Sequence, residues 1–128
     1  MRNELADRYL VEKVSTASPA ELIGMLYDAA VVAMQAAQAS AEAGQVNDTH
    51  RHLVRAQNIV GELRCSLDLS VGEIAANLDA LYEFLGRRLI EANLKKDPAI
   101  VAECLHVFTP LRDGWNEGCL GRAPVAVG

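Results

Sequence analysis

The stretch NLDALYEFLGRRLIEANLKKDP, residues 77–98, has the hydrophobic spacing of one amphipathic helix, which we expect to span residues 72–95. With about 100° of rotation per residue, one face of this helix collects Ile74, Leu78, Leu81, Leu85, Leu89 and Ala92. Tyr82 and Phe84 lie at the two edges of this face, so the apolar arc is roughly 160° wide instead of the roughly 100° that a bundle helix buries. Gly86 lies beyond Tyr82, and a small residue beside an aromatic one predicts a dent in the helix surface.

An earlier helix is predicted where Ser18-Pro19 precedes a long apolar segment. Serine can cap a helix, proline suits the first helical position, and Glu21 completes a capping box. This helix should end at Gly44. Between Leu22 and Ala39 it is apolar nearly all round and is interrupted only by Gly24, Asp28, Gln35 and Gln38. A helix with this composition must be covered by other elements.

Two further segments repeat apolar residues at three- and four-residue spacing, and each predicts a helix. One covers about residues 48–67, with Asn47 or Asp48 as its cap. The other opens with Asp97-Pro98, again a capping residue followed by proline. Pro110 falls inside this last helix and should kink it or end its regular part.

Four helices of similar length, joined by short connections, favour antiparallel neighbours. The alternation of β-branched residues that is typical of strands is absent from the sequence. We therefore predict an all-α fold, an antiparallel up-down four-helix bundle over residues 18–117. Residues 1–17 should form a separate, partly amphipathic arm with a short helix, and residues 118–128 a flexible tail.

The composition narrows the classes of function. The 128 residues carry a net charge of −5, which argues against a nucleic-acid binder held by phosphate contacts. The purest apolar run, residues 29–34, is too short to span a bilayer, and the N-terminus lacks the apolar core of a signal peptide. Three widely spaced cysteines, Cys65, Cys104 and Cys119, fit a reducing cytosol. We expect a cytoplasmic protein that neither binds nucleic acid nor inserts into membranes.

The motifs of common enzyme classes are missing from the sequence. Glu103 and His106 stand at helical spacing, but a di-iron bundle needs a second such pair, and none occurs. Cys65 follows Arg64, which could lower a thiol pKa, yet a buried structural cysteine is the better interpretation because no histidine partner is arranged near it. We predict no enzymatic activity, no metal and no cofactor.

The predicted helices carry more apolar surface than one core requires. Tyr27 and Val32 lie off the central stripe of their helix, and Ile59 lies beside the stripe of the next one. This surplus must be covered by the arm, by a second copy or by a partner chain. Alanine at Leu81 should then cost about 2–5 kcal/mol of stability. Alanine at Tyr82 should cost less stability and more binding.

Four segments, in order along residues 9–117, resemble the flagellin export chaperone family, FliS. They are TASPAELIGMLYDAAV (16–31), AQNIVGELRCSLDL (56–69), NLDALYEFLGRRLIEANLKKDP (77–98) and LRDGWNE (111–117). The pattern NLxxLYxxxxRRLxxAN in the third segment is the most specific part of the resemblance. Phe84 departs from the family, which often has a second tyrosine at this position.

The resemblance implies an antiparallel helical bundle in the bacterial cytoplasm that binds the disordered C-terminal segment of newly made flagellin. Such a chaperone would prevent premature polymerisation and help to deliver flagellin to the flagellar type III export apparatus. The resemblance also implies an N-terminal arm that covers part of the binding surface in the free protein. A component of the export gate, a co-chaperone or an anti-sigma factor would be further partners, as in some family members.

We predict a partner-binding groove from the surplus apolar surface and the resemblance together. Its apolar lining would be Leu26, Tyr27, Ile59, Leu63, Leu78, Tyr82 and Leu85. Tyr9 and Leu10 of the arm would occupy part of it when the client is absent. Arg55 and Arg88 at the rim would pair with acidic client residues, the alternative being two solvated charges. The rival hypothesis is a structural homodimeric adaptor that buries the surplus surface between copies and does not bind flagellin.

Overall fold

The computed structural model describes residues 4–119, without the side chains of Glu4, Ala6, Tyr9 and Cys119. The α-helices of this part are α1 (Glu4–Thr16), α2 (Pro19–Glu42), α3 (Val46–Cys65), α4 (Glu73–Lys95) and α5 (Pro98–Gly114). A 3₁₀ turn, Leu69–Val71, precedes α4, and a π-helical turn, Trp115–Cys119, follows α5. Residues 4–119 contain no β-strand. The predicted all-α class is therefore confirmed.

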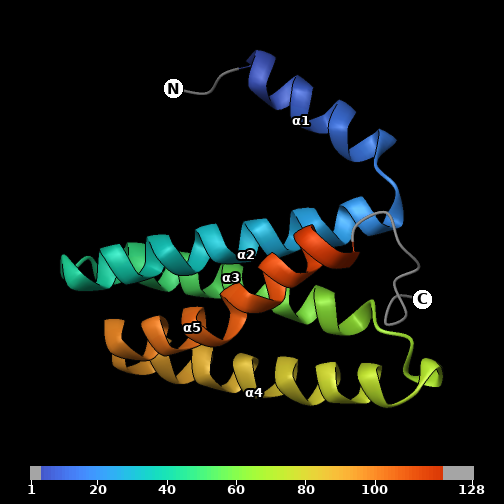
Figure 1. Ribbon diagram of the computed structural model, residues 1–128. Helices are drawn as coiled ribbons and strands as arrows, with labels where there is room; N and C mark the ends of the chain where they lie inside the picture. Colours follow the sequence, from blue (N-terminus) through green and yellow to red (C-terminus); the bar gives the residue numbers. More distant parts are fainter. Residues whose placement is uncertain (1–3, 120–128) are drawn as a thin grey trace.

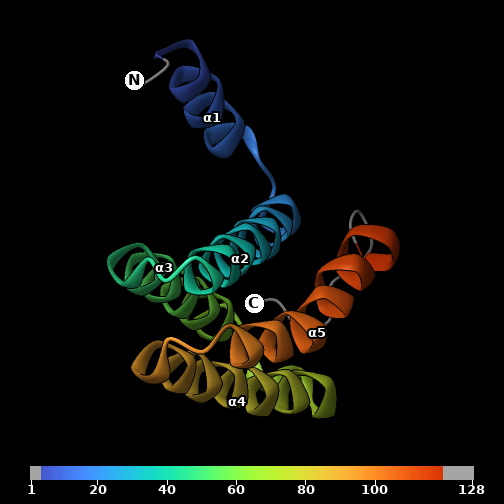
Figure 2. The ribbon, with the colours of Figure 1, turned by 90° about the vertical axis from the view of Figure 1, so that its left-hand side faces the viewer.

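Helices α2 to α5 pack side by side around one core (Figure 1). α2 contacts α3 and α5, and α4 contacts the same two helices, so that α2 and α4 lie diagonally across the bundle. The chain reverses direction at each connection, as short connections between packed helices require. α1 projects away from the four packed helices in both views (Figure 2).

Local sequence signals set the starts of two helices. Ser18 Oγ accepts the backbone N–H of Glu21 at 3.2 Å, which confirms the predicted serine cap of α2; the Glu21 carboxylate accepts the Ser18 hydroxyl at 3.0 Å and not the backbone N–H that a full capping box would use. Asp97 Oδ1 accepts the N–H of Ala99 at 2.9 Å, and Pro98 takes the first position of α5. Both caps satisfy backbone donors that a helix leaves unpaired.

The predicted cap of the helix at residues 48–67 is wrong. α3 begins earlier, at Val46, and its N-cap residue Gln45 makes no side-chain capping bond. The turn is held instead by Gly44 in the left-handed region (φ 71°) and by a hydrogen bond of 2.9 Å between the buried hydroxyls of Ser40 and Thr49. This hydrogen bond joins α2 to α3, so α3 begins directly after the turn without a side-chain cap.

The face that α4 buries differs from the predicted one. Its buried residues are Ala75, Tyr82, Leu85, Leu89 and Ala92. Leu81, predicted to lie within the stripe, is only partly buried, and Ile74 is 57% exposed. Tyr82, predicted at the edge, is only 3% exposed. The apolar arc was wider than the contact with α3 and α5, and packing selected its Tyr82 side.

The C-terminal end of the bundle closes onto the start of α2. Pro110 lies inside α5 and does not end it, because the helix continues to Gly114. The following turn places the indole of Trp115 so that Nε1 donates to the carbonyl oxygen of Ala20 at 3.1 Å. A Cβ atom at Gly24 would lie 3.4 Å from the same indole nitrogen, at ordinary van der Waals contact, so Trp115 packs directly on this part of α2. Most of the predicted tail, residues 118–128, lies outside the described residues.

We expect Tyr82→Ala to lower the free energy of unfolding by about 3–5 kcal/mol, because it empties a large buried site. Leu81→Ala should cost less, about 1–2 kcal/mol, because this side chain is only partly buried. Phe84→Ala is the matched aromatic control on the same helix and should cost less than Tyr82→Ala, because Phe84 is 38% exposed. Urea unfolding followed by circular dichroism measures all three. A larger loss for Leu81→Ala than for Tyr82→Ala would contradict the observed packing.

Candidate functional site between helices α2 and α3

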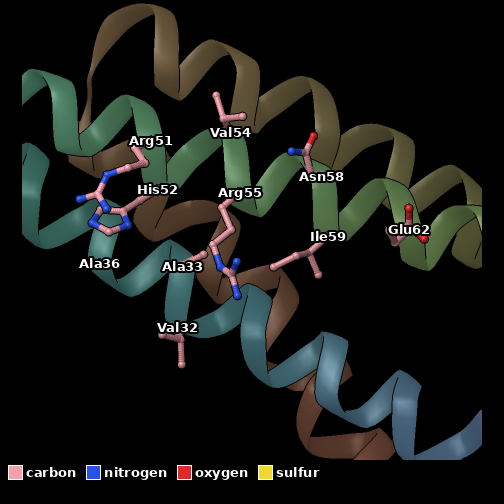
Figure 3. Close-up of a pocket in the computed structure, with 10 residues that line it drawn as sticks. All are labelled: Val32, Ala33, Ala36, Arg51, His52, Val54, Arg55, Asn58, Ile59 and Glu62. Atoms are coloured by element: carbon pink, nitrogen blue, oxygen red, sulfur yellow. The ribbon is translucent and has the colours of Figure 1, made fainter. Parts of the chain in front are cut away.

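An open cleft of about 630 Å³ lies between α2 and α3. α2 contributes Val32, Ala33 and Ala36, and α3 contributes an opposing row that includes Ile59 (Figure 3). The two alanines form a low ridge, because their side chains are single methyl groups. Val32 is 63% exposed at the edge of the cleft, although it belongs to a core helix. The cleft therefore presents apolar surface in a concave site, as binding sites for apolar groups do.

The α3 side of the cleft is polar at both ends. Arg51 and His52 lie at the end near the α2–α3 turn, Arg55 lies in the middle, and Glu62 lies at the opposite end (Figure 3). Arg51 pairs with Asp48 at 2.9 Å on the surface. Arg55 is exposed and has no ion-pair partner among residues 4–119. A charged partner can therefore reach it without breaking an existing pair.

Two of the predicted groove residues line this cleft. They are Ile59, which is only 8% exposed at the base of the cleft, and Arg55, at its rim. Sequence reasoning missed the small residues Ala33 and Ala36 as well as the second arginine, Arg51. Val32 could have been found, because it lies off the central stripe of its helix and still belongs to the longest apolar segment.

Four other residues predicted to line the groove are core residues. Tyr27 is 4% exposed, and Tyr82, Leu63 and Leu85 are buried with it in the bundle. The expectation that these side chains lie open to solvent is wrong. The sequence showed a surplus of apolar residues but not which of them the diagonal contact between α2 and α4 would enclose. Leu26 and Leu78 pack partly buried against the core and do not line the cleft.

The hydroxyl groups of Tyr27 and Tyr82 form a buried hydrogen bond between α2 and α4. Burial, reinforced by the neighbouring Tyr27 hydroxyl, raises the pKa of Tyr82 far above its ordinary value. Tyr82 also lines a second, smaller cleft of about 270 Å³ between α3 and α4. Gly61 and Gly86 line this second cleft, so the dent predicted beside Tyr82 is present.

Arg88 does not lie at the rim of the α2–α3 cleft. Its Nε atom donates to Glu103 Oε2 of α5 at 2.8 Å, and its guanidinium also pairs with Glu91 of α4. With 26% of its side chain exposed, it ties α4 to α5 across their surface. The alternative of a simple solvated charge is therefore wrong as well. Glu103, which stands at helical spacing from His106, pairs with this arginine.

The arm does not cover the cleft in this structure. α1 projects from the bundle, and Leu10 is 52% exposed. The side chain of Tyr9 lies outside the described residues. Leu10, Val11 and Val14 leave a continuous apolar face of α1 open to solvent. The structure thus has a second uncovered apolar surface, on the arm, in addition to the cleft.

The described residues do not contain a cluster of three or more histidine, cysteine, aspartate or glutamate side chains that could hold a metal. Burial raises the pKa of the Cys104 thiol to about 11, so this thiol is protonated and unreactive at neutral pH. α2 is long and apolar enough to cross a bilayer by length and composition, but 44% of its most apolar window is buried in the bundle. That burial is typical of a core helix.

The fold is an α-helical bundle with an open apolar cleft, and comparisons with known proteins identify its family. The family model described as "Flagellar protein FliS" matches residues 1–121. The flagellar secretion chaperone FliS of Bacillus subtilis is 34% identical over 109 residues, covering 85% of this chain and 81% of the relative.

Two further relatives carry the same name. FliS of Salmonella typhimurium is 37% identical over 106 residues, 81% of this chain and 78% of the relative. FliS of Escherichia coli is 35% identical over 109 residues, 84% of this chain and 80% of the relative. The chain belongs to the FliS family, and its role is that of a flagellar secretion chaperone and not of an enzyme. The resemblance found in the sequence is thereby confirmed.

The buried tyrosine pair predicts a loss of stability in alkali. The pKa of Tyr82 is raised in the folded chain, whereas an unfolded tyrosine titrates near 10. Above about pH 10 the unfolded chain releases this proton and the folded chain keeps it, so the free energy of unfolding falls as the pH rises. One tyrosine contributes at most about 1.4 kcal/mol per pH unit. Tyr82→Phe should flatten the fall measured by urea unfolding between about pH 9.5 and 11.5, and equal slopes for both proteins would contradict this origin.

Proposed function

We propose that the α2–α3 cleft binds the disordered C-terminal segment of flagellin in the cytoplasm. The bound chaperone prevents premature polymerisation of flagellin and helps to deliver it to the flagellar type III export apparatus. The observation that carries this proposal is the open apolar cleft between α2 and α3, with Val32 63% exposed at its edge, in a member of a secretion chaperone family. A disordered chain can fold into helices as it enters such a groove.

The residues that line the cleft are suited to binding a disordered client chain. A client that folds on binding gives up conformational entropy, so many modest apolar contacts are needed for a useful affinity. The small side chains of Ala33 and Ala36 let a client helix approach the backbone of α2 closely. The chaperone lowers the concentration of free client by mass action and needs no nucleotide.

We also propose that the arm covers the cleft when no client is bound. α1 is joined to α2 by residues 17 and 18 only, so it can fold back along α2. Its 13 residues form a helix about 20 Å long, enough to reach as far along α2 as Val32. The open apolar face with Leu10 and Val14 needs a cover of this kind, because isolated short helices are unstable in water.

Val32→Gln should weaken the binding of flagellin about fivefold, because it replaces an exposed apolar contact worth about 1 kcal/mol. Leu94→Gln is the matched control: Leu94 is 81% exposed on α4, outside the α2–α3 cleft. Isothermal titration calorimetry with full-length flagellin should show a change for the first variant alone. Flagellin shortened by roughly its last forty residues, a length that could wrap the bundle, should not bind. Retained binding by the shortened flagellin would refute the proposed client segment.

Deletion of residues 1–17 should tighten the binding of flagellin, because a client no longer competes with the arm for the cleft. The dissociation constants of the full-length and shortened chaperones, measured by calorimetry under the same conditions, test this. Equal or weaker affinity of the shortened chaperone would rule out the arm as a cover.

A homodimer is the second candidate, and the uncovered face of α1 is the observation that favours it. In that case the arm of one copy packs against another copy. Light scattering over a range of concentrations separates the two candidates. A monomer that forms a one-to-one complex with flagellin supports the chaperone with a covering arm. A dimer that ignores flagellin supports the structural adaptor.

A further inference from the structure

The charge of the α2–α3 cleft is opposite in sign to that of the whole chain. The chain has a net charge of −5. The cleft is lined by the basic residues Arg51, His52 and Arg55 and by the acidic residue Glu62. This acidic protein thus has a locally basic rim beside its apolar cleft. The charge of the rim affects which partners the cleft can bind.

The two arginines are arranged to meet a pair of acidic side chains. Arg51 and Arg55 stand one helical turn apart on α3, which places them on the same face of the helix. Arg55 extends across the mouth of the cleft toward α2 (Figure 3). Arg55 is without an ion pair in the described residues, and the pair of Arg51 with Asp48 has side chains 69% and 49% exposed. Such an exposed pair is worth little and exchanges readily for another carboxylate.

The charges are also arranged along the cleft and give it a direction. Arg51 lies near the α2–α3 turn, where α2 ends, and Glu62 lies toward the start of α2 (Figure 3). A helix has a partial negative charge at its C-terminus and a partial positive charge at its N-terminus. A helix bound in the cleft is therefore favoured with its C-terminus at the arginines and its N-terminus at Glu62. It runs in the same direction as α2.

We infer that the occupant of the cleft is an amphipathic helix with acidic side chains near its C-terminal end, seated against Arg51 and Arg55. This inference rests on the proposed function, since it describes the part of the flagellin segment that the cleft holds. The apolar face of this helix packs on Val32, on Ala36 and on the small part of Ile59 that the cleft leaves exposed, and two acidic residues one turn apart pair with the arginines. The apolar contacts supply most of the affinity, and the charged pairs set direction and register.

The test is calorimetry with the purified C-terminal segment of flagellin and three variants of the full-length chaperone. Arg55→Glu should weaken binding roughly three- to tenfold, and Arg51→Glu combined with Arg55→Glu should weaken it further. Lys95→Glu is the control with the same change of charge as Arg55→Glu, because Lys95 is 61% exposed on α4 and outside the cleft. The effect of the double variant should shrink as salt is raised toward 1 M, because salt screens exposed charges.

The outcomes separate this inference from the proposed function. Failure of the unaltered chaperone to bind the segment would overturn both. Binding that the double variant and Lys95→Glu change equally would overturn the inference alone. Arg51→Gln and Arg55→Gln give the same comparison without an added charge, should reversal disturb folding.

A photo-crosslinking residue at position 52 tests the direction, because His52 lies at the end of the cleft near the α2–α3 turn and its replacement keeps both arginines. Crosslinks to the acidic, C-terminal end of the bound helix support the inference. Crosslinks confined to the opposite end would overturn the assigned direction.

Discussion

The buried hydrogen bond between the hydroxyls of Tyr27 and Tyr82 is the constraint on which the arrangement of the bundle depends. It joins α2 and α4, which lie diagonally across the core. A buried hydroxyl without a partner is costly, so the two helices must keep the rotation that brings these groups together. Tyr27 also packs against Phe108 and Trp115, with ring centroids 5.4 and 6.0 Å away, and so links α5 to the same centre.

That rotation decides which surfaces remain for binding. With Tyr27, Ala30 and Met34 turned into the core, the next residues around α2 face the groove beside α3. Val32 and Ala36 are therefore open to solvent or to a partner, although they belong to the most apolar helix of the chain. The core thus uses the aromatic residues of the family-like segments, and the cleft uses the small aliphatic residues beside them.

The elements themselves were largely predictable, because local rules act on short stretches of chain. Ser18 with Glu21, and Asp97 with Pro98, predicted two helix starts. The capping hydrogen bonds at both starts are made within four residues along the chain. The start of α3 was not predictable in this way, because its turn is held by Ser40 and Thr49, two residues on different helices. The apolar cleft was expected in kind, from the surplus of apolar surface. Of the residues predicted to line it, however, only Ile59 and Arg55 do so, since helical periodicity gives an arc and not the neighbour that covers it.

The sequence by itself determined that this chain is all-α, that its apolar surface exceeds the needs of one core, and that it resembles the FliS family. The first two follow from composition and spacing along the chain, and the resemblance rests on four segments that are similar to those of the family. Only the tertiary structure decided that Tyr82 belongs to the core and Leu81 to its margin, that Arg88 ties α4 to α5, and that a basic rim borders the α2–α3 cleft. The reason is physical: burial and pairing depend on the rotation of each helix against its neighbours. The buried contacts between α2, α4 and α5 set that rotation.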